Sequence, residues 1–149
     1  MKKRYLYFAY GSNLNLEQMK ARCPDSRIYG PGILYEFKLM FRTHLDIEKD
    51  HRSKVEGTLF EVSERDLENL DRYEGVPRYY TREPVEVTCY NKELLSFVYI
   101  MRNQTNTNLP SIQYWNVVSQ GYKDCHMSRR SLYRALKRSG GYLNLNLYK

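Results

Sequence analysis

Strand-like segments follow one another in this chain without the regular alternation of strand and helix that a parallel sheet requires. The predicted order is strand, helix, several strands, a short helix, two strands and finally helices. Antiparallel strands can be joined by short turns, whereas parallel strands need long crossover connections. The order therefore predicts an α+β fold with a mostly antiparallel, barrel-like sheet. At 149 residues the chain has the length of one ordinary domain, and we expect residues 1–149 to form one.

Most of the strand-like runs are aromatic or alternate in hydrophobicity, and turn residues bound them. Residues 5–10 end at Gly11, and residues 29–45 predict one long strand or two bent ones. Residues 46–54 are almost wholly polar, so we expect a surface loop there. The remaining predictions are strands over residues 55–62, 80–90 and 94–101, a hairpin turn at Asn91-Lys92, and a loop over residues 102–109.

Four helices are expected where a capping residue precedes apolar residues at helical spacing. Asn13 or Asn15 can cap the first helix, and Ser63 with Asp66 three residues later is a variant of the capping box for the second. The expected helices cover residues 16–22 before Pro24, residues 64–73 before Gly75, residues 112–125 after Pro110-Ser111, and a last segment from Ser128 to about Gly140-Gly141.

Cysteine usage and hydropathy favour a cytoplasmic protein. Cys23, Cys89 and Cys125 are odd in number and lack CxxC spacing, so neither a disulfide framework nor a thiolate zinc site is indicated. The charged opening is followed by a stretch too short and too tyrosine-rich for a signal peptide, and no run is long enough to span a membrane. We therefore expect a reducing cytoplasm and no membrane partner.

The formal net charge of +7 attracts nucleic acids, membrane surfaces and anionic small ligands alike, so it does not choose among them. Aromatic residues are not interleaved with Lys and Arg in a stacking pattern, and we expect no nucleic-acid partner. Apart from Lys2 to Arg4, the basic residues gather only in one late group, which we interpret as a solvated helix face. That group is Arg129, Arg130, Arg134, Lys137 and Arg138.

Glu74 is the most informative single residue. In a helix, Leu67, Leu70 and Glu74 lie at i, i+3 and i+7, so the carboxylate shares the apolar stripe that should face the core. A carboxylate there is either paired with a cation or kept partly protonated, and a raised pKa is what a general acid/base working near neutral pH needs. The alternative is that Glu74, at the end of a short helix, points to water or pairs with Arg72 or Arg78.

Other titratable residues give weaker signals. Asp71 lies near the same helix face, which suggests a paired-carboxylate site for a metal or a glycosidic bond, but no nearby histidine supports a metal. We therefore interpret Asp71 as a hydrogen-bonding support. His44, His51 and His126 have no ligand spacing among them, so we expect surface or core roles for them and no metal site.

The segment from Tyr10 to Leu14 reads Tyr-Gly-Ser-Asn-Leu and follows the first expected strand. Gly11 lets the backbone approach a ligand, and the N–H groups of such a turn can point at a carboxylate or an oxyanion. The segment lacks the Gly-Lys-Ser or Gly-Lys-Thr end of a P-loop, and Leu14 replaces the last Gly of a GxSxG elbow. Ser12 as a nucleophile would need a histidine base, and the sequence singles none out. An ordinary turn is the alternative.

Two separated motifs resemble the hallmarks of the γ-glutamylcyclotransferase family, an opening Tyr-Gly-Ser-Asn loop and a later Leu-Asp-x-x-Glu-Gly segment. Here they read Tyr7-Phe-Ala-Tyr-Gly-Ser-Asn-Leu14 and Leu70-Asp-Arg-Tyr-Glu-Gly-Val76. Further matches are Tyr79-Tyr80, Tyr99 and the segment Pro110-Ser-Ile-Gln-Tyr114. The resemblance spans about residues 7–136, nearly the whole chain.

The resemblance implies a small mixed β-barrel with helices around it, and an enzyme that releases 5-oxoproline from a γ-glutamyl amide. The α-amino group of the substrate attacks its own side-chain carbonyl carbon, so the resemblance implies no protein nucleophile, metal or cofactor. Enzymes of this family act on γ-glutamyl amino acids, on γ-glutamyl-lysine amines or on γ-glutamylated antibiotic intermediates. The expected partner is therefore a small molecule, and the oligomeric state and the leaving amine stay open.

By the same resemblance, Glu74 is the general acid/base, and the loop cradles the γ-glutamyl group through backbone N–H groups. Some family members have a longer segment after the glutamate, so either Tyr79 or Tyr80 can be the matching tyrosine, and we favour Tyr80. Core packing is the alternative for each tyrosine in a chain with 15 of them. The expected substrate-binding residues are Tyr10, Gly11, Ser12, Asn13, Leu14, Tyr80, Tyr99 and Tyr114.

Three hypotheses follow for the function. The first is a cyclotransferase with Glu74 as acid/base. The second is a non-catalytic binding module on the same fold, for example one that binds nucleic acid through the late basic helix, and salt-dependent retention on heparin would reveal it. The third keeps the fold and the glutamate but hydrolyses the amide with water. Product analysis separates the last from the first, because hydrolysis yields free glutamate and cyclisation yields 5-oxoproline.

Overall fold

The computed structural model describes residues 3–140 and 145–148 and has a five-stranded barrel in which the strands follow the order β1-β3-β2-β4-β5. β1 and β5 pair in parallel, through Tyr7 and Phe97, and the other neighbours are antiparallel. The expected α+β fold with a mostly antiparallel barrel is confirmed. The strands are β1 (Arg4–Ala9), β2 (Arg27–Arg42), β3 (His44–Ser63), β4 (Tyr80–Cys89) and β5 (Lys92–Met101).

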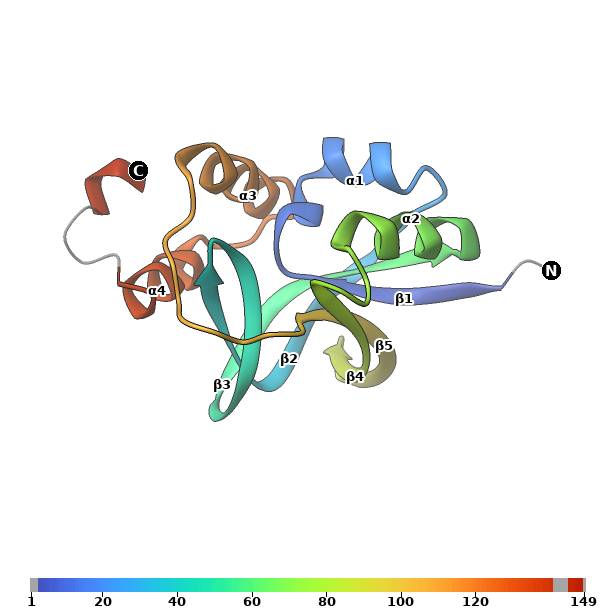
Figure 1. Ribbon diagram of the computed structural model, residues 1–149. Helices are drawn as coiled ribbons and strands as arrows, with labels where there is room; N and C mark the ends of the chain where they lie inside the picture. The colour runs from blue at the N-terminus through green and yellow to red at the C-terminus, as the bar shows by residue number, and fades with distance from the viewer. Residues whose placement is uncertain (1–2, 141–144, 149) are drawn as a thin grey trace.

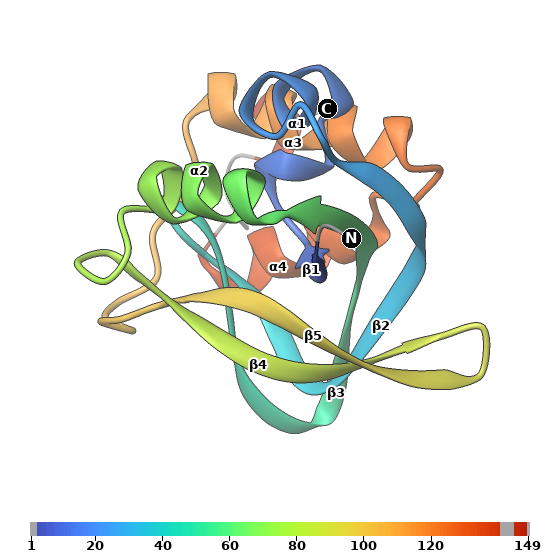
Figure 2. The same ribbon diagram turned by 90° about the vertical axis from the view of Figure 1, so that its right-hand side faces the viewer.

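In the part of the chain that the structure describes, four α-helices and two short 3₁₀ segments pack around this barrel. In Figures 1 and 2, α1, α2 and α3 lie on one side of the molecule, and the β4–β5 hairpin lies on the opposite side. α4 packs against β2. The helices are α1 (Leu16–Arg22), α2 (Glu64–Glu74), α3 (Ile112–Asp124) and α4 (Arg130–Arg138), and the 3₁₀ segments are η1 (Ser12–Leu14) and η2 (Leu145–Tyr148).

The surface loop expected over residues 46–54 is wrong, because these residues lie within β3. β2 runs as one strand with register shifts at residues 28–30 and 35–37, and it turns directly into β3 at Thr43, whose φ is 68°. Backbone pairing with β2 makes residues 46–54 a strand whatever their side chains are. Most of their polar side chains reach solvent, while the fully buried Asp46 receives hydrogen bonds from Arg42 at 2.8 Å and from the N–H of Met101 at 2.9 Å.

The turn between β4 and β5 lies one residue earlier than expected, at Tyr90-Asn91. Both residues have positive φ, 48° and 66°, as in the two-residue type I′ turn that matches the twist of a hairpin. Pairing of Cys89 with Lys92 closes the hairpin, which leaves Asn91, a residue that tolerates positive φ, at the second central position. The loop expected over residues 102–109 is confirmed apart from a single bridge between Arg42 and Asn108.

The predicted helix caps explain where the helices stop and start. Asn15, and not Asn13, caps α1 by accepting from the N–H of Gln18 at 3.2 Å. The capping box of Ser63 and Asp66 is present at the start of α2, and Gly75 ends this helix in the left-handed region at φ 68°. Glu74 is therefore the last residue of α2. The last helix begins at Arg130 rather than Ser128, and Gly141 lies outside the described residues.

The core joins β1 to α3 and thereby fixes the segment from Tyr10 to Leu14. Gly121 of α3 lies so close to this segment that a Cβ there would be 2.6 Å from the carbonyl carbon of Leu14. Tyr122 donates its hydroxyl proton to the carbonyl of Tyr10 at 2.9 Å, and Asn15 donates to the carbonyl of Val117 at 3.2 Å. The loop after β1 is thus held by tertiary contacts on the side that faces α3.

The late basic group lies at the surface, as expected. The five basic side chains of the late group are exposed on or beside α4, as a solvated face requires. The three cysteines are free thiols. Within residues 3–140 and 145–148, no helix is both long enough and apolar enough to cross a lipid bilayer.

Candidate active site

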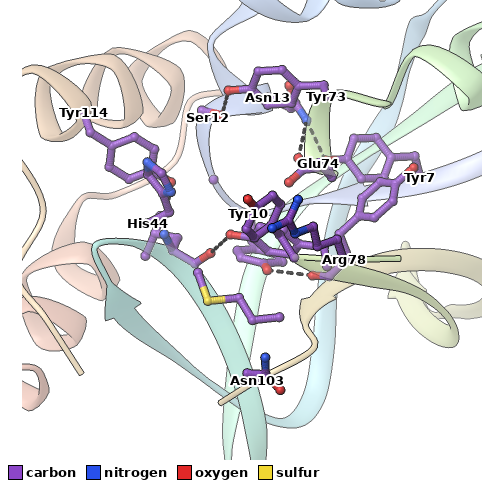
Figure 3. Close-up of a pocket in the computed structure, with 16 residues that line it drawn as sticks. Tyr7, Tyr10, Ser12, Asn13, His44, Tyr73, Glu74, Arg78, Asn103 and Tyr114 are labelled. Carbon is purple, nitrogen blue, oxygen red and sulfur yellow. Dashed lines mark hydrogen bonds between the residues drawn. The ribbon is translucent and has the colours of Figure 1, made fainter. Parts of the chain in front are cut away.

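A cavity of about 570 Å³ lies at the end of the barrel where the last residues of β1 and β5 meet the first residues of β3 and β4. The end of α2 and the start of α3 complete its wall (Figure 3). Its size suits a small-molecule ligand. The lining residues are Tyr7, Tyr10, Gly11, Ser12, Asn13, His44, Leu45, Tyr73, Glu74, Arg78, Tyr79, Tyr80, Tyr99, Met101, Asn103 and Tyr114.

Eight of the nine site residues expected from the sequence line this cavity, although they come from five separate segments. The exception is Leu14. Its side chain is fully buried in the core, and its N–H donates to the carbonyl of Gly11 at 3.0 Å, which closes η1. Tyr80 is half-buried in the wall, whereas Tyr79 lines the cavity with a side chain that is 61% exposed.

Glu74 is half-buried at the cavity because α2 ends there and turns its last side chain inward. Its carboxylate accepts one long hydrogen bond, from Nδ2 of Asn13 at 3.4 Å. Burial raises the pKa of Glu74 to about 7, and the positive charge of Arg22 works against that rise. Within the described part of the chain, neither Arg72 nor Arg78 forms an ion pair with it. This carboxyl group can therefore both give and take a proton near neutral pH.

Three of the tyrosines use their hydroxyl protons within the protein. Tyr10 donates to the carbonyl of Tyr99 at 2.7 Å, and Tyr80 donates to the carbonyl of Leu45 at 3.0 Å. Tyr99 donates to Asp71 at 2.7 Å. Asp71 also accepts from Arg82 at 2.7 Å, so it acts as the hydrogen-bonding support expected from the sequence. These hydroxyls shape the wall and have no second proton for a ligand.

Two other tyrosine hydroxyls serve as acceptors and so keep their own protons. The hydroxyl of Tyr114 accepts from the N–H of Leu45 at 3.1 Å, and that of Tyr7 accepts from Nδ2 of Asn13 at 2.9 Å. Burial raises the pKa of both phenols well above the ordinary value, so both stay protonated at neutral pH. Among the five tyrosines described so far, Tyr7 and Tyr114 are therefore the two whose hydroxyls can donate a hydrogen bond to a bound molecule.

The loop after β1 presents backbone donors at the cavity. No hydrogen bond joins the N–H groups of Ser12 or Asn13 to a protein acceptor among residues 3–140 and 145–148. A Cβ on Gly11 would lie in van der Waals contact with the hydroxyl of Tyr114, at 3.5 Å. Gly11 thus keeps open the space where backbone N–H groups and a phenol can reach the same ligand oxygen.

Sequence reasoning missed several residues of the site, and the reason differs among them. Tyr7 lies in the recognised opening motif, but only the fold shows that its ring faces Asn13. His44 was hidden because the β2–β3 turn was not predicted; its ring lies 4.8 Å from that of Tyr114, and partial burial lowers its pKa. The other missed lining residues are Leu45, Tyr73, Arg78, Met101 and Asn103.

The charged and sulfur side chains do not assemble a metal centre in the described chain. No group of three or more His, Cys, Asp or Glu residues there could hold an ion. His44 and Glu74 line the same cavity but have no third ligand beside them.

A comparison with known protein families shows to which family this chain belongs. The model of the family described as gamma-glutamyl cyclotransferase, AIG2-like, matches residues 7–117, about three quarters of the chain. The chain belongs to this family. The match includes every lining residue of the cavity, from Tyr7 to Tyr114.

Relatives of known name agree with this family membership. The gamma-glutamylcyclotransferases of Bos taurus and Homo sapiens are 33% and 31% identical to the chain, over 80% of its length and 71% of theirs. A solved gamma-glutamyl cyclotransferase structure superposes with a TM-score of 0.80 at 27% identity, covering 89% of this chain and 86% of the other. An uncharacterized human protein gives the same TM-score at 28% identity, with 90% and 87% covered. The barrel and its helices are those of a gamma-glutamyl cyclotransferase.

Proposed function

We propose that this family member is a γ-glutamylcyclotransferase that converts a γ-glutamyl amide into 5-oxoproline and a free amine or amino acid, with Glu74 as the general acid/base. The observation that carries the proposal is the state of Glu74. It is a half-buried carboxyl group in the wall of the cavity, no cation of the described residues forms an ion pair with it, and its pKa lies at about 7. A group with these properties can accept and return a proton within one reaction cycle.

The reaction needs no second reactant, because its atoms balance within the substrate. The substrate enters with its α-amino group as an ammonium, and Glu74 removes one proton from it. The amine nitrogen then attacks the γ-carbonyl carbon, which forms the ring C–N bond and places negative charge on the oxygen. Breaking the original amide C–N bond completes the transfer. The attacking nitrogen loses two protons in total. Glu74 transfers them one at a time to the nitrogen of the leaving amine, which departs as an ammonium.

Other lining groups would stabilise the negative charge that develops on the γ-carbonyl oxygen. The free N–H groups of Ser12 and Asn13 and the hydroxyl proton of Tyr114 point to a donor set for a carboxylate or an oxyanion. Tyr10, Tyr80 and Tyr99 would position the substrate by shape, since their hydroxyl protons are already engaged. Holding the amine near the carbonyl in one folded conformer contributes further through proximity.

The test is mass-spectrometric detection of 5-oxoproline after the protein is incubated with γ-glutamyl dipeptides and γ-glutamyl amines. Glu74→Gln is the inactive variant, and Glu68→Gln, an exposed carboxylate on the same helix, is the matched control. We expect product from the wild type and from Glu68→Gln only, and the best substrate identifies the leaving amine. Free glutamate in place of 5-oxoproline would indicate hydrolysis by water. A folded wild type that gives neither product would count against catalysis and favour a binding role.

A further inference from the structure

Arg22 lies beside the cavity without lining it, and three sets of contacts hold its side chain. The guanidinium stacks on the ring of Tyr73, with Cζ 3.5 Å from the ring centroid. One nitrogen, Nη2, donates to Oε1 of Gln18 at 2.7 Å. The other, Nη1, donates to Oδ1 of Asn13 at 2.6 Å and lies 3.4 Å from the hydroxyl of Ser12. Fixing a long charged side chain in one conformation costs conformational entropy. A function of Arg22 in the neighbouring site would account for these three sets of contacts.

The contact with Asn13 determines which way its amide points. A guanidinium has only donors, so the amide atom that faces it must be the oxygen. The amide nitrogen of Asn13 then faces the opposite way, where its two protons reach the hydroxyl of Tyr7 at 2.9 Å and Oε1 of Glu74 at 3.4 Å. Figure 3 shows Asn13 between Tyr7 and Glu74 with both hydrogen bonds drawn.

Turning the amide over would change the chemistry of the site. The amide oxygen would then face the carboxyl oxygen of Glu74, and two acceptors would repel each other unless Glu74 kept its proton. It would also take the proton of Tyr7, which would no longer be free for a ligand. The orientation that Arg22 imposes therefore favours an ionised Glu74 and a donating Tyr7.

The positive charge of Arg22 also favours the ionised form of Glu74. Burial alone disfavours the carboxylate form of Glu74, and the positive guanidinium offsets part of that cost. The groups that face the carboxyl from the other elements are neutral phenols with a raised pKa, from β1, β4, β5 and α3. His44 on β3 has a lowered pKa, and Arg78, the cation of the lining, is exposed. The facing phenols are Tyr7, Tyr10, Tyr80, Tyr99 and Tyr114.

We propose that Arg22 is a positioning residue for the acid/base: it locks the amide of Asn13 toward Tyr7 and Glu74, and its charge keeps Glu74 able to ionise at neutral pH. This inference rests on the proposed function, because it explains how the ionisation of the acid/base is controlled. It also makes a statement about the titration of Glu74 that holds whether or not a substrate is known.

The experiment compares Arg22→Gln, Arg22→Lys and the control Arg27→Gln. Arg27 pairs with Glu61 at 2.8 Å on the far part of β2 and β3, so its removal changes the net charge equally without touching the cavity. The first readout is the titration of the Glu74 carboxyl carbon by NMR, with its signal assigned by its loss in Glu74→Gln. The second is the pH profile of kcat/KM for 5-oxoproline release.

Each variant has a distinct expected result. Arg22→Gln should raise the midpoint of the Glu74 titration by about half a unit to one unit, and shift the acid limb of kcat/KM to higher pH by the same amount. Arg22→Lys keeps the charge but cannot hold Asn13, Gln18 and the ring of Tyr73 together. Its Glu74 midpoint should stay near that of the wild type, while kcat/KM falls about three- to tenfold. Arg27→Gln should match the wild type in both readouts.

Two outcomes would overturn the proposal. One is a Glu74 midpoint in Arg22→Gln equal to that of the wild type, and the other is an Arg22→Lys enzyme with unchanged kcat/KM. If Arg22→Gln does not fold, as its circular dichroism spectrum would reveal, Arg22→Lys still decides the positioning role. If the wild type forms no 5-oxoproline from any substrate, the proposed function fails, and the NMR titration still decides whether Arg22 controls the ionisation of Glu74.

Discussion

Two carboxyl groups of this protein, the buried Asp46 and the half-buried Glu74, have opposite surroundings. Asp46 is fully buried, and it receives hydrogen bonds from Arg42 at 2.8 Å, from the N–H of Met101 at 2.9 Å and from Gln104 at 3.1 Å. Among the described residues, Glu74 has only the 3.4 Å hydrogen bond from Asn13. Burial pushes the pKa of both groups upward, and for Asp46 the donors around it pull the pKa back.

The difference separates a structural carboxylate from a reactive one. The partners of Asp46 come from β2, the end of β5 and the loop after it, so the carboxylate ties the β2–β3 hairpin to the strand that ends at the cavity. A carboxylate with its lone pairs occupied has little capacity left to exchange protons with a ligand. Glu74 keeps that capacity because the protein leaves it without close donors. The comparison makes four predictions.

The largest expected effect is on catalysis at Glu74. Glu74→Gln should lower kcat for 5-oxoproline release by about 10²- to 10⁴-fold, because the amide can neither take nor return the transferred proton. Steady-state kinetics with the best γ-glutamyl substrate provide the measurement, and Glu68→Gln should behave like the wild type. A Glu74→Gln enzyme within tenfold of the wild type would remove the glutamate from the mechanism.

The next effect is on stability at Asp46. Asp46→Ala should lower the free energy of unfolding by about 3–5 kcal/mol, because it breaks a buried ion pair and leaves Nη1 of Arg42 and the N–H of Met101 buried without their acceptor. Urea unfolding followed by circular dichroism measures the loss. The exposed Glu83 on β4 supplies the control, and Glu83→Ala should change stability by less than about 0.5 kcal/mol. Equal values for the two variants would contradict a structural role for Asp46.

A smaller effect is expected in the pH dependence of folding stability, which distinguishes Glu74 from a carboxyl group with an ordinary pKa. The pKa of Glu74 is raised from 4.5 to about 7 in the folded protein, so the folded state binds more protons than the unfolded state within that range. The wild type should therefore lose stability relative to Glu74→Gln as the pH rises from 4.5 to 7, by at most about 3 kcal/mol. Thermal unfolding of both proteins at pH 4, 6 and 8 checks this. A constant difference in Tm across these values would show that Glu74 has an ordinary pKa.

The smallest effect concerns Tyr114, one of the two tyrosines described above whose hydroxyl proton is free for a ligand. Tyr114→Phe should lower kcat/KM by about tenfold, which corresponds to one hydrogen bond to the substrate. The control is Tyr133→Phe, whose hydroxyl donates to the carbonyl of Tyr148 away from the cavity, and it should leave kcat/KM unchanged. If Tyr133→Phe caused the same loss as Tyr114→Phe, the effect would be a general loss of packing rather than a lost donor to the substrate.

Local sequence signals predicted the helices better than the sheet. The caps at Asn15, Ser63 and Gly75 act within a few residues of the chain, so their positions follow from residue types alone. The strand over residues 46–54 was missed because its polarity is that of a loop, and only pairing with β2 makes it extended. Burial of Asp46 could not be foreseen either, since its partners lie up to 58 residues away.

The sequence by itself determined that the last residue of α2 is a carboxylate on an apolar helix face, and that Gly11, Ser12 and Asn13 form a turn after a strand. These are properties of short segments, and helix periodicity and capping fix them. Only the tertiary structure decided that the two segments meet, that Arg22 orients Asn13 between them, and which phenols keep a proton. Hydrogen-bond direction depends on which donor and which acceptor come within about 3 Å, and chain folding alone sets those distances.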